Sequence, residues 1–450
     1  MKDKNTAVKY LIIGNSAGGI GAAEAIRQVD KKGSLFIVSD EPYPAYSRPL
    51  ISHHLAEGRP LEKMLFRPAD FYEQNAVQTM LGSKAQRLDV AAHTVELEGG
   101  RIITWEKLLL ATGGLPIVPP IKSVERDGVF TFTTLDDAKA IDRFLDRFGS
   151  RARRAVVIGG GLIGVSATEA LVKRGIAVTI VEMKDHILNV MLDETASAIE
   201  EAALLKAGVH IITGRTVAEI RSRSNDMPDS AVLDDGTAVP CDLVIVAIGV
   251  RPRAELAAGA GIAVNRGITV DRSMRTSSPD VYACGDAAEA YDIIYGERRL
   301  TPIWPNAYLG GIVAGSNMAG GQAEYPGGTA MNSLKYFGVD VVSAGMVNPP
   351  DDSYEVISQR HNDSYHKVIL KDGWLAGMVF AGNIENSGIA FGLMRDRVNV
   401  SRFKSALVAE DFGLASLPER IWQPCLEMRP RDRVLATATQ ELPEEPALGE

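Results

Sequence analysis

The stretch Tyr10–Asp40, YLIIGNSAGGIGAAEAIRQVDKKGSLFIVSD, contains two apolar runs separated by a glycine-rich turn and a helical segment. The run Tyr10–Ile13 predicts a buried strand, and Ile20–Val29 predicts the helix that follows it. A second apolar strand is predicted at Ser34–Ser39, and it closes on Asp40. The order strand, turn, helix, strand is that of a βαβ unit, the building block of parallel sheets.

The turn between the first strand and the helix is Gly14-x-Ser16-x-x-Gly19. A dinucleotide-binding turn normally offers three glycines, because they permit a tight bend and let backbone N–H groups approach a pyrophosphate at the helix N-terminus. Serine is small enough for the middle position, and Asp40 follows about 20 residues later, where a carboxylate accepts a ribose hydroxyl. Taken alone, the turn fits either a dinucleotide site or an ordinary strand–helix connection.

A second unit of the same kind begins at Arg154, with RAVVIGGGLIGVSATEAL. Here all three glycines, Gly159, Gly161 and Gly164, are present, and the next strand, within AVTIVEM, ends in Glu182. Each unit therefore has a strand before the turn, a helix after it and an acid at the end of the second strand. Two units that meet all three conditions predict two dinucleotide sites on one chain.

The composition limits the class of protein. The chain of 450 residues is 46% hydrophobic and 23% charged, which is typical of a globular protein of two or three domains. No apolar run approaches the length of about 18 residues that spans a membrane, and MKDKNTAVKY lacks the apolar core of a secretory signal, so we expect a cytoplasmic protein. The net charge of −9 argues against nucleic acid as a partner.

Three cysteines are spread along the chain. Cys241, Cys284 and Cys425 include no C-x-x-C pair, so neither a disulfide framework nor a metal site is expected. Cys241 and Cys284 lie in strongly apolar segments and are predicted to be small buried core residues. Cys425 lies in the acidic C-terminal tail and is assigned no role.

Two further segments carry a resemblance to a known family. KLLLATGG, at Lys107–Gly114, is a buried strand that ends in a Thr-Gly-Gly turn. SSPDVYACGDAAEA, at Ser277–Ala290, is a short strand that leads into Gly285, Asp286 and a predicted helix. Together with the two glycine turns, these segments resemble the two-dinucleotide-binding flavoproteins, the family that includes glutathione reductase, rubredoxin and ferredoxin reductases, and apoptosis-inducing factor. The resemblance covers about residues 8 to 415, nearly the whole chain.

The resemblance implies that the first turn holds FAD and that the second holds NADH. The residues implied to bind FAD are Gly14, Ser16, Ala17, Gly18, Gly19, Asp40, Glu41, Arg48, Thr112, Gly113 and Asp286. Those implied to bind the nicotinamide nucleotide are Gly159, Gly161, Leu162, Ile163, Gly164, Glu182 and Gly249. A carboxylate at Glu182 accepts ribose hydroxyls and repels a 2′-phosphate, which predicts a preference for NADH over NADPH, tempered by the nearby Lys184.

The implied fold is α/β, with two Rossmann-like dinucleotide-binding domains, the NAD domain inserted in the FAD domain, and a C-terminal α+β interface domain. Residues 1–120 and 249–325 are assigned to the FAD-binding domain and 121–248 to the NAD(P)H-binding domain. Residues 326–420 are assigned to the C-terminal domain and 421–450 to a mobile tail. Because the C-terminal domain often makes the dimer interface in this family, a homodimer is expected.

The segment after Asp40 distinguishes the branches of the family. Disulfide reductases carry a C-x-x-x-x-C pair there and coenzyme A disulfide reductases a single cysteine, whereas DEPYPAYSRPLISHHLAEG contains none. It resembles instead the PY-x-RPPLSK segment of rubredoxin reductases and apoptosis-inducing factor, which includes Arg48. The family's lysine falls at His53 and its glutamate partner at Ser166, which we interpret as a neutral replacement of an ion pair. His53 is a candidate proton donor near the flavin, and a structural or exposed histidine fits the pattern equally well.

The implied reaction is hydride transfer from NADH to FAD, with the protein orienting the two rings. Without a redox cysteine near the flavin, electrons pass directly to a ferredoxin- or rubredoxin-type protein, or to another acceptor such as oxygen, as in an NADH oxidase. The alternative is a redox-sensing flavoprotein subunit that binds NADH and docks on a larger complex with little turnover. The basic run Arg395–Lys404 fits a docking face for an acidic carrier and also fits an ordinary solvated surface.

Overall fold

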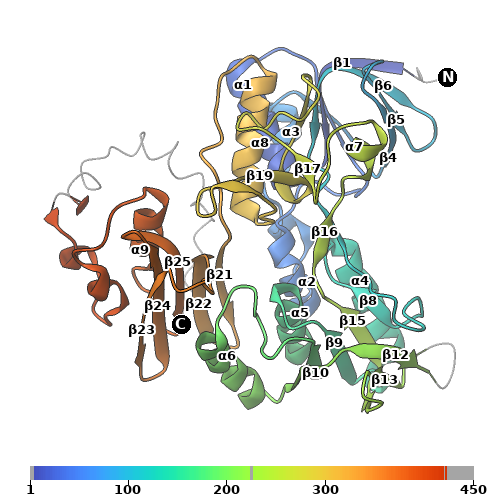
Figure 1. Cartoon of the computed structure of the whole chain (residues 1–450). Helices are drawn as coiled ribbons and strands as arrows, with labels where there is room; N and C mark the ends of the chain where they lie inside the picture. Colours follow the sequence, from blue (N-terminus) through green and yellow to red (C-terminus); the bar gives the residue numbers. More distant parts are fainter. Residues whose placement is uncertain (1–4, 223–226, 420, 423–450) are drawn as a thin grey trace, which may run out of the picture.

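The structure, a computed structural model, describes residues 5–222, 227–419 and 421–422 (Figure 1). Its three largest sheets have seven, five and five strands, and each forms the centre of one domain. In Figure 1 the first domain lies at the top, the second at the lower right and the third at the left. The predicted mobile tail lies outside the described residues from residue 423 onward, and so does Cys425.

The first domain is built on the seven-stranded sheet, in the order β3-β2-β1-β6-β5-β4 with β18 paired to β6. The strands β3, β2, β1, β6 and β18 are parallel, as the βαβ pattern predicts, and β4 and β5 add an antiparallel edge. The strands are β1 (Asn5–Ile13), β2 (Leu35–Ser39), β3 (Val77–Leu81), β4 (Ala85–Asp89), β5 (Thr94–Leu97), β6 (Ile102–Leu110) and β18 (Val281–Ala283). The helices are α1 (Ala17–Val29), α3 (Phe71–Gln74), α7 (Glu255–Gly259) and α8 (Trp304–Met318).

Helices α1 and α8 lie side by side in this domain (Figure 1) and pack backbone to backbone. A Cβ atom on Gly311 of α8 would lie 2.1 Å from the carbonyl oxygen of Gly18 in α1, so this position requires glycine. The same packing brings the first turn of α8 against the loop that follows β18, where a Cβ atom on Gly285 would lie 3.4 Å from that of Ala307. The start of α8 is therefore held beside the predicted flavin-binding Asp286.

The second domain contains a parallel sheet in the order β11-β10-β9-β15-β8. Its strands are β8 (Val129–Thr131), β9 (Arg154–Ile158), β10 (Ala177–Glu182), β11 (His210–Thr213) and β15 (Leu243–Val246). Its helices are α4 (Leu135–Phe148), α5 (Leu162–Lys173) and α6 (Glu194–Lys206), and a small antiparallel sheet is formed by β12 (Val217–Arg221), β13 (Ser230–Leu233) and β14 (Ala238–Pro240). The helix α2 (Ile51–Glu57), from the segment after β2, packs against α4 and α5.

Two connections join the second domain to the first. The outgoing chain forms β7 (Gly114–Pro116) and the returning chain forms β16 (Val250–Pro252), and these strands pair with each other in antiparallel fashion. The two segments, at residues 114–116 and 250–252, therefore lie side by side although they are far apart in the sequence. The second domain is attached to the first through this two-stranded connection.

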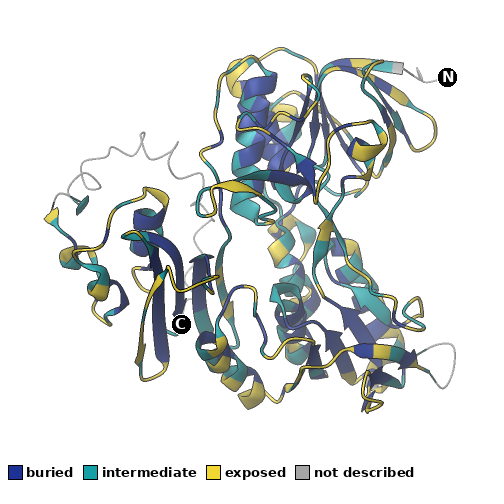
Figure 2. Cartoon of the chain, in the orientation of Figure 1, coloured by how far each residue is buried: buried dark blue, intermediate teal, exposed yellow. Residues whose placement is uncertain are grey.

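The third domain is an antiparallel sheet in the order β21-β22-β25-β24-β23. Its strands are β21 (Met331–Tyr336), β22 (Val339–Gly345), β23 (Glu355–His361), β24 (Ser364–Lys371) and β25 (Trp374–Ala381). One face, which includes Val342 and Phe380, packs with α9 (Ser387–Arg395), and the other, which includes Val341 and Val379, belongs to the core of the second domain. Figure 2 shows the buried residues concentrated in the strands of the three sheets.

The prediction of a helix after Gly285 and Asp286 is wrong. The chain makes a single turn, η4 (Gly285–Ala287), and then the strand β19 (Ala288–Asp292), which pairs with β17 (Ile268–Thr269) and β20 (Glu297–Arg299). Alanine and glutamate favour a helix locally, but strand pairing with β17 and, in a hairpin, with β20 overrides that preference. The remaining short turns are η1 (Arg48–Leu50), η2 (Leu61–Lys63), η3 (Gly149–Arg151), η5 (Lys404–Val408) and η6 (Leu414–Ser416).

The architecture confirms the predicted fold class, in which one Rossmann-like domain is inserted in another and an α+β domain follows. Within the described part of the chain, no helix has the length and apolar character needed to cross a bilayer.

Candidate active site

The first glycine turn is shaped by close backbone contacts. Gly14 has a φ of 122°, and a Cβ atom on it would lie 2.0 Å from the carbonyl oxygen of Ala111 in the strand-end beside it. A Cβ atom on Gly19 would lie 2.0 Å from the carbonyl oxygen of Gly14. Ser16 is the residue before α1, in extended conformation, and no side chain caps the helix there. The serine is therefore compatible with the turn, and the first amides of α1 are available to an anion such as a pyrophosphate.

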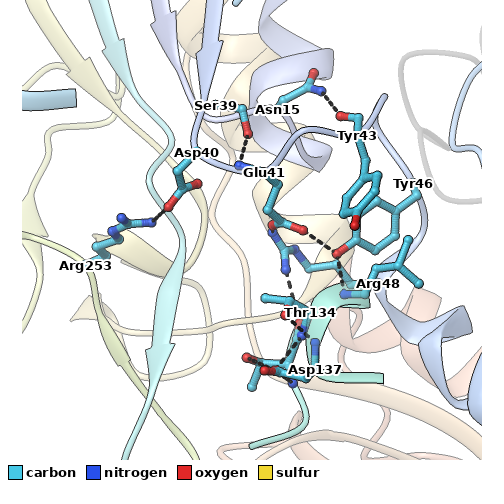
Figure 3. Close-up of polar contacts among 12 residues, drawn as sticks. Asn15, Ser39, Asp40, Glu41, Tyr43, Tyr46, Arg48, Thr134, Asp137 and Arg253 are labelled. Carbon is cyan, nitrogen blue, oxygen red and sulfur yellow. Dashed lines mark hydrogen bonds and ion pairs between the residues drawn. The ribbon is translucent and has the colours of Figure 1, made fainter. Parts of the chain in front are cut away.

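A pocket of about 530 Å³ opens at the carboxyl ends of β1 and β2. It brings together Gly14, Asp40 and Thr112, which come from three separate segments and were each predicted to bind FAD. The side chain of Asp40 accepts a hydrogen bond from Arg253 at 2.6 Å (Figure 3). The hydroxyl of Thr112 donates to the backbone carbonyl of Arg253 at 2.6 Å. Sequence reasoning missed Arg253, because its partner Asp40 lies 213 residues away in the sequence.

Glu41 and Arg48 form an ion pair on the other side of this loop (Figure 3). Glu41 also accepts a hydrogen bond from the phenol of Tyr46 at 2.6 Å, so its carboxylate is engaged by two neighbours of its own segment. Arg48 donates to the carbonyl of Thr133 at 3.1 Å, and the phenol of Tyr46 accepts from the amide of Leu135 at 3.0 Å. The structure thus places Glu41 as the residue that holds Arg48, and both Arg48 and Tyr46 connect the first domain to the start of α4.

Arg48 lies close enough to Asp286 for their charges to interact. Burial raises the pKa of Asp286, and the charge of Arg48 opposes that rise. In the residues that the structure describes, no side chain donates a hydrogen bond to the Asp286 carboxylate. The residue is half-buried and its own backbone amide interacts with the carboxylate, which leaves acceptor capacity for a hydroxyl-bearing ligand. The helix terminus, the pocket beside Asp40 and the carboxylate of Asp286 together fit an FAD molecule.

The second glycine turn contains two glycines in close backbone contact and one, Gly161, with free space beside it. A Cβ atom on Gly159 would lie 2.5 Å from the carbonyl oxygen of Ala247, and one on Gly164 would lie 1.9 Å from that of Gly159. In contrast, a Cβ atom on Gly161 would meet nothing within 4 Å, and the same holds for Gly249. The absence of a side chain at Gly161 therefore leaves space at the start of α5, which suits the close approach of a pyrophosphate.

Glu182 ends β10 beside this turn, with a side chain that is mostly buried. One of its oxygens accepts from the amide of Gly160 at 2.6 Å and the other from the amide of Lys184 at 2.9 Å. These two bonds fix the carboxylate next to the glycine turn, where the resemblance places the ribose of the nicotinamide nucleotide. Leu162 and Ile163 form the first turn of α5, and both are half-buried.

His53 lies on α2, half-buried, toward α5. Burial lowers the pKa of His53 below its ordinary value, and the charges of Arg59 and Lys173 lower it further. Glu57 and Glu169 oppose this effect. A pKa below the ordinary value favours the neutral imidazole at pH 7.

The neighbouring His54 has fixed partners. Its Nδ1 atom is 2.7 Å from the carbonyl oxygen of Arg59, and its Nε2 atom is 3.4 Å from a carboxylate oxygen of Asp142 in α4. Ser166, in α5, faces the phenol of Tyr336 in β21, to which sequence reasoning assigned no role. Burial raises the pKa of Tyr336, and Ser166 opposes that rise.

The two described cysteines are free thiols in the core. Burial raises the pKa of Cys241 and that of Cys284 to about 12, so neither forms a thiolate readily at neutral pH. Cys284 is fully buried against α1, with its sulfur 2.7 Å from where a Cβ atom on Gly18 would lie. Both cysteines therefore have the structural position that the sequence predicts. No group of three or more potential metal ligands is found among the described residues.

Comparison with known proteins defines the class. Residues 8–311 match the family described as pyridine nucleotide-disulphide oxidoreductase, and residues 331–398 match the rubredoxin NAD+ reductase C-terminal domain. The chain belongs to the pyridine nucleotide-disulphide oxidoreductase family. It is an NAD(P)H-dependent flavoprotein oxidoreductase of the branch that contains the ferredoxin and rubredoxin reductases, as the resemblance predicted.

Several known proteins are similar to this chain in sequence or structure. It is 32% identical over 411 residues to the epsilon subunit of the NADH-dependent phenylglyoxylate dehydrogenase of Aromatoleum evansii, with 90% of this chain and 96% of that subunit covered. It is 30% identical to the nitrite reductase [NAD(P)H] of Bacillus subtilis, over 87% of this chain and 48% of that enzyme, so it spans about half the length of that relative. A ferredoxin reductase structure from Rhodopseudomonas palustris superimposes with a TM-score of 0.80 and 25% identity, covering 92% of this chain and 99% of that one.

Proposed function

We propose that the protein oxidises NADH at the second glycine turn and passes the electrons from FAD to an iron–sulfur or rubredoxin-type protein, without a redox-active disulfide. The observation that carries this proposal is the state of the cysteines. Residues 41–60 contain none, and burial raises the pKa of both described thiols to about 12. The likeness to a ferredoxin reductase supports the class of acceptor.

The chain's own residues bind and orient the reactants. The first amides of α1 bind the FAD pyrophosphate, Asp286 accepts a hydrogen bond from the flavin side, and Arg48, held by Glu41, provides a cation opposite Asp286. Bound FAD supplies the two-electron chemistry that accepts a hydride and releases single electrons. The first amides of α5 and the space above Gly161 orient the nicotinamide nucleotide.

Of the two roles left open for His53, that of a structural histidine has better support than that of a proton donor. Its pKa lies below the ordinary value, so the imidazolium that a general acid needs is a minor form at pH 7. Glu182 supports NADH as the preferred donor, because its fixed carboxylate repels a 2′-phosphate.

The decisive experiment measures electron stoichiometry and acceptor choice. Anaerobic titration of the purified protein with dithionite should consume about two electrons per FAD, because no disulfide takes up a further pair. Replacing Cys241, Cys284 and Cys425 by serine should leave NADH-driven flavin reduction within a few-fold of wild type, allowing for lost packing at Cys284. A consumption of four electrons per FAD that falls to two in the cysteine-free variant contradicts the proposal. Rates with ferredoxin, rubredoxin, quinone and oxygen, measured side by side, identify the acceptor.

A second candidate function is supported by one observation. The relative that matches nearly end to end is named as a subunit, which favours a flavoprotein subunit docked on a larger complex. Rapid turnover with a purified ferredoxin supports the free reductase. A long-lived complex of NADH and reduced flavin, with a changed oligomeric state in light scattering, supports the subunit. The same measurement tests the proposed homodimer through the third domain.

A further inference from the structure

The FAD pocket is closed on one side by a residue of the returning connection. Arg253 directly follows β16, and its backbone is attached to the Thr-Gly-Gly turn at two points. Its amide donates to the carbonyl of Gly113 at 2.9 Å, and its carbonyl accepts from the hydroxyl of Thr112 at 2.6 Å. Its guanidinium donates to Asp40 at 2.6 Å (Figure 3). Three of its groups therefore contact three residues of the predicted FAD site.

We infer that Arg253 is a positioning residue for FAD, which fixes the carboxylate of Asp40 against the AMP half of the cofactor. Asp40 is 40% exposed at the mouth of the pocket, so without a partner its side chain is free to rotate into solvent. A guanidinium on one carboxylate oxygen holds the rotamer and leaves the other oxygen to accept a ribose hydroxyl. Arg253 itself is 25% exposed, which limits the loss of this ion pair to solvent screening.

Arg251, a second arginine of the returning connection, has a different environment. Arg251, within β16 itself, lines the same pocket, but it pairs with Glu255, and both side chains are more than half exposed. An exposed pair of this kind contributes little to binding. The two arginines are two residues apart and carry the same charge, so they form a matched pair for mutagenesis.

The position of Arg253 links the cofactor to the attachment of the second domain. The strand pair β7–β16 carries the chain out to that domain and back, and Arg253 joins its returning strand to Asp40. FAD that engages Asp40 therefore also restrains the connection. This inference rests on FAD binding, which follows from the family, and is independent of the proposed electron acceptor.

The test uses apoprotein of the full chain and measures the dissociation constants of FAD and FMN by quenching of flavin fluorescence. R253A should weaken FAD about 10- to 100-fold, the worth of one charge-assisted hydrogen bond, and should leave FMN unchanged, because FMN lacks the AMP half. R253K should lie between wild type and R253A, and R251A should remain within about threefold of wild type. In the D40A background, adding R253A should weaken FAD binding by less than about threefold further.

Several results overturn the inference. These are an unchanged FAD affinity in R253A, a loss of FMN affinity as large as that of FAD affinity, or a loss of FAD affinity in R251A as large as that in R253A. A loss of FAD affinity on adding R253A to D40A that is as large as in the wild type also overturns it. Hydrogen exchange of the wild type provides a test that needs no variant to fold. FAD, and not FMN, should slow exchange in residues 112–116 and 249–256. Equal exchange in these segments with and without FAD also overturns the inference, whatever the affinity of the variants.

Discussion

Glu200 offers a sharp test of how the second and third domains are held together. It lies on the face of α6 that packs against β22, β24 and β25, and its side chain is fully buried. Neither of its carboxylate oxygens has a hydrogen-bond partner among the described residues. The buried Lys367 on β24 is bound instead to Asp193 at 2.8 Å, where Asp193 caps the start of α6. Burial, with a smaller contribution from the charge of Glu169, raises the pKa of Glu200 to about 8.

The sign and size of the effect follow from this shift. An acid whose pKa is higher in the folded than in the unfolded state stabilises the fold fully below its unfolded pKa, and this stability is lost as the pH rises to the folded pKa. For Glu200 the window runs from about 4.5 to about 8. At about 1.4 kcal/mol per pH unit, the wild type loses about 2 kcal/mol between pH 6 and pH 7.5 through this one group.

The variant Glu200→Gln has the same shape and does not titrate. Its free energy of unfolding, measured by urea titration of the FAD-loaded protein with circular dichroism, should therefore rise relative to wild type by about 2 kcal/mol from pH 6 to pH 7.5. The control is Glu194→Gln, an exposed residue in the same helix, whose difference from wild type should be independent of pH. If the difference in free energy of unfolding between Glu200→Gln and wild type stays constant or falls as the pH rises, Glu200 is not a buried neutral acid.

Three further outcomes are expected. Gly161→Ala should keep a normal flavin spectrum and weaken NADH binding, measured by stopped-flow flavin reduction, whereas Gly164→Ala should destabilise the fold because its Cβ atom would lie 1.9 Å from a backbone oxygen. Glu182→Ala should raise the ratio of kcat/KM for NADPH to that for NADH, and a wild-type preference for NADPH or an unchanged ratio contradicts this role. Lys367→Met should lower the free energy of unfolding by about 3 kcal/mol, because it leaves the charge of Asp193 without its cation. Adding Asp193→Asn should recover most of this loss. A loss below about 1 kcal/mol in Lys367→Met contradicts a buried ion pair.

Features that depend on local chain geometry could be predicted from the sequence. Both glycine turns and the acids that follow them are encoded within about 30 residues each, because the bend, the helix terminus and the second strand are neighbours in the chain. The close contacts at Gly14 and Gly164 show why these positions allow only glycine. The buried state of Cys284 also followed from its apolar surroundings in the sequence.

Features that depend on distant segments could not be predicted. The strand at Ala288–Asp292 pairs with β17, some 20 residues earlier, as well as with β20 in a hairpin, against the helical preference of its own residues. Arg253 meets Asp40 only when the chain returns from the second domain. Glu200 sits in an ordinary helical sequence, and its isolation arises from the third domain that covers it. In each case the property belongs to a tertiary contact, which hydrophobic periodicity does not encode.

The discontinuity of the first domain has a consequence for the order in which the protein matures during synthesis. The parallel sheet of the second domain runs from β8 to β15, so all its strands have been made once residue 246 is synthesised. The first domain begins earlier but lacks β18, Asp286 and the glycine-packed α8 until residue 318. Domains fold as units once their segments are present. The sheet of the inserted domain, although translated later, therefore has all its strands on the ribosome before the surrounding domain does, whereas its core closes only when β22 to β25 have been made. FAD is retained only after the surrounding domain has closed.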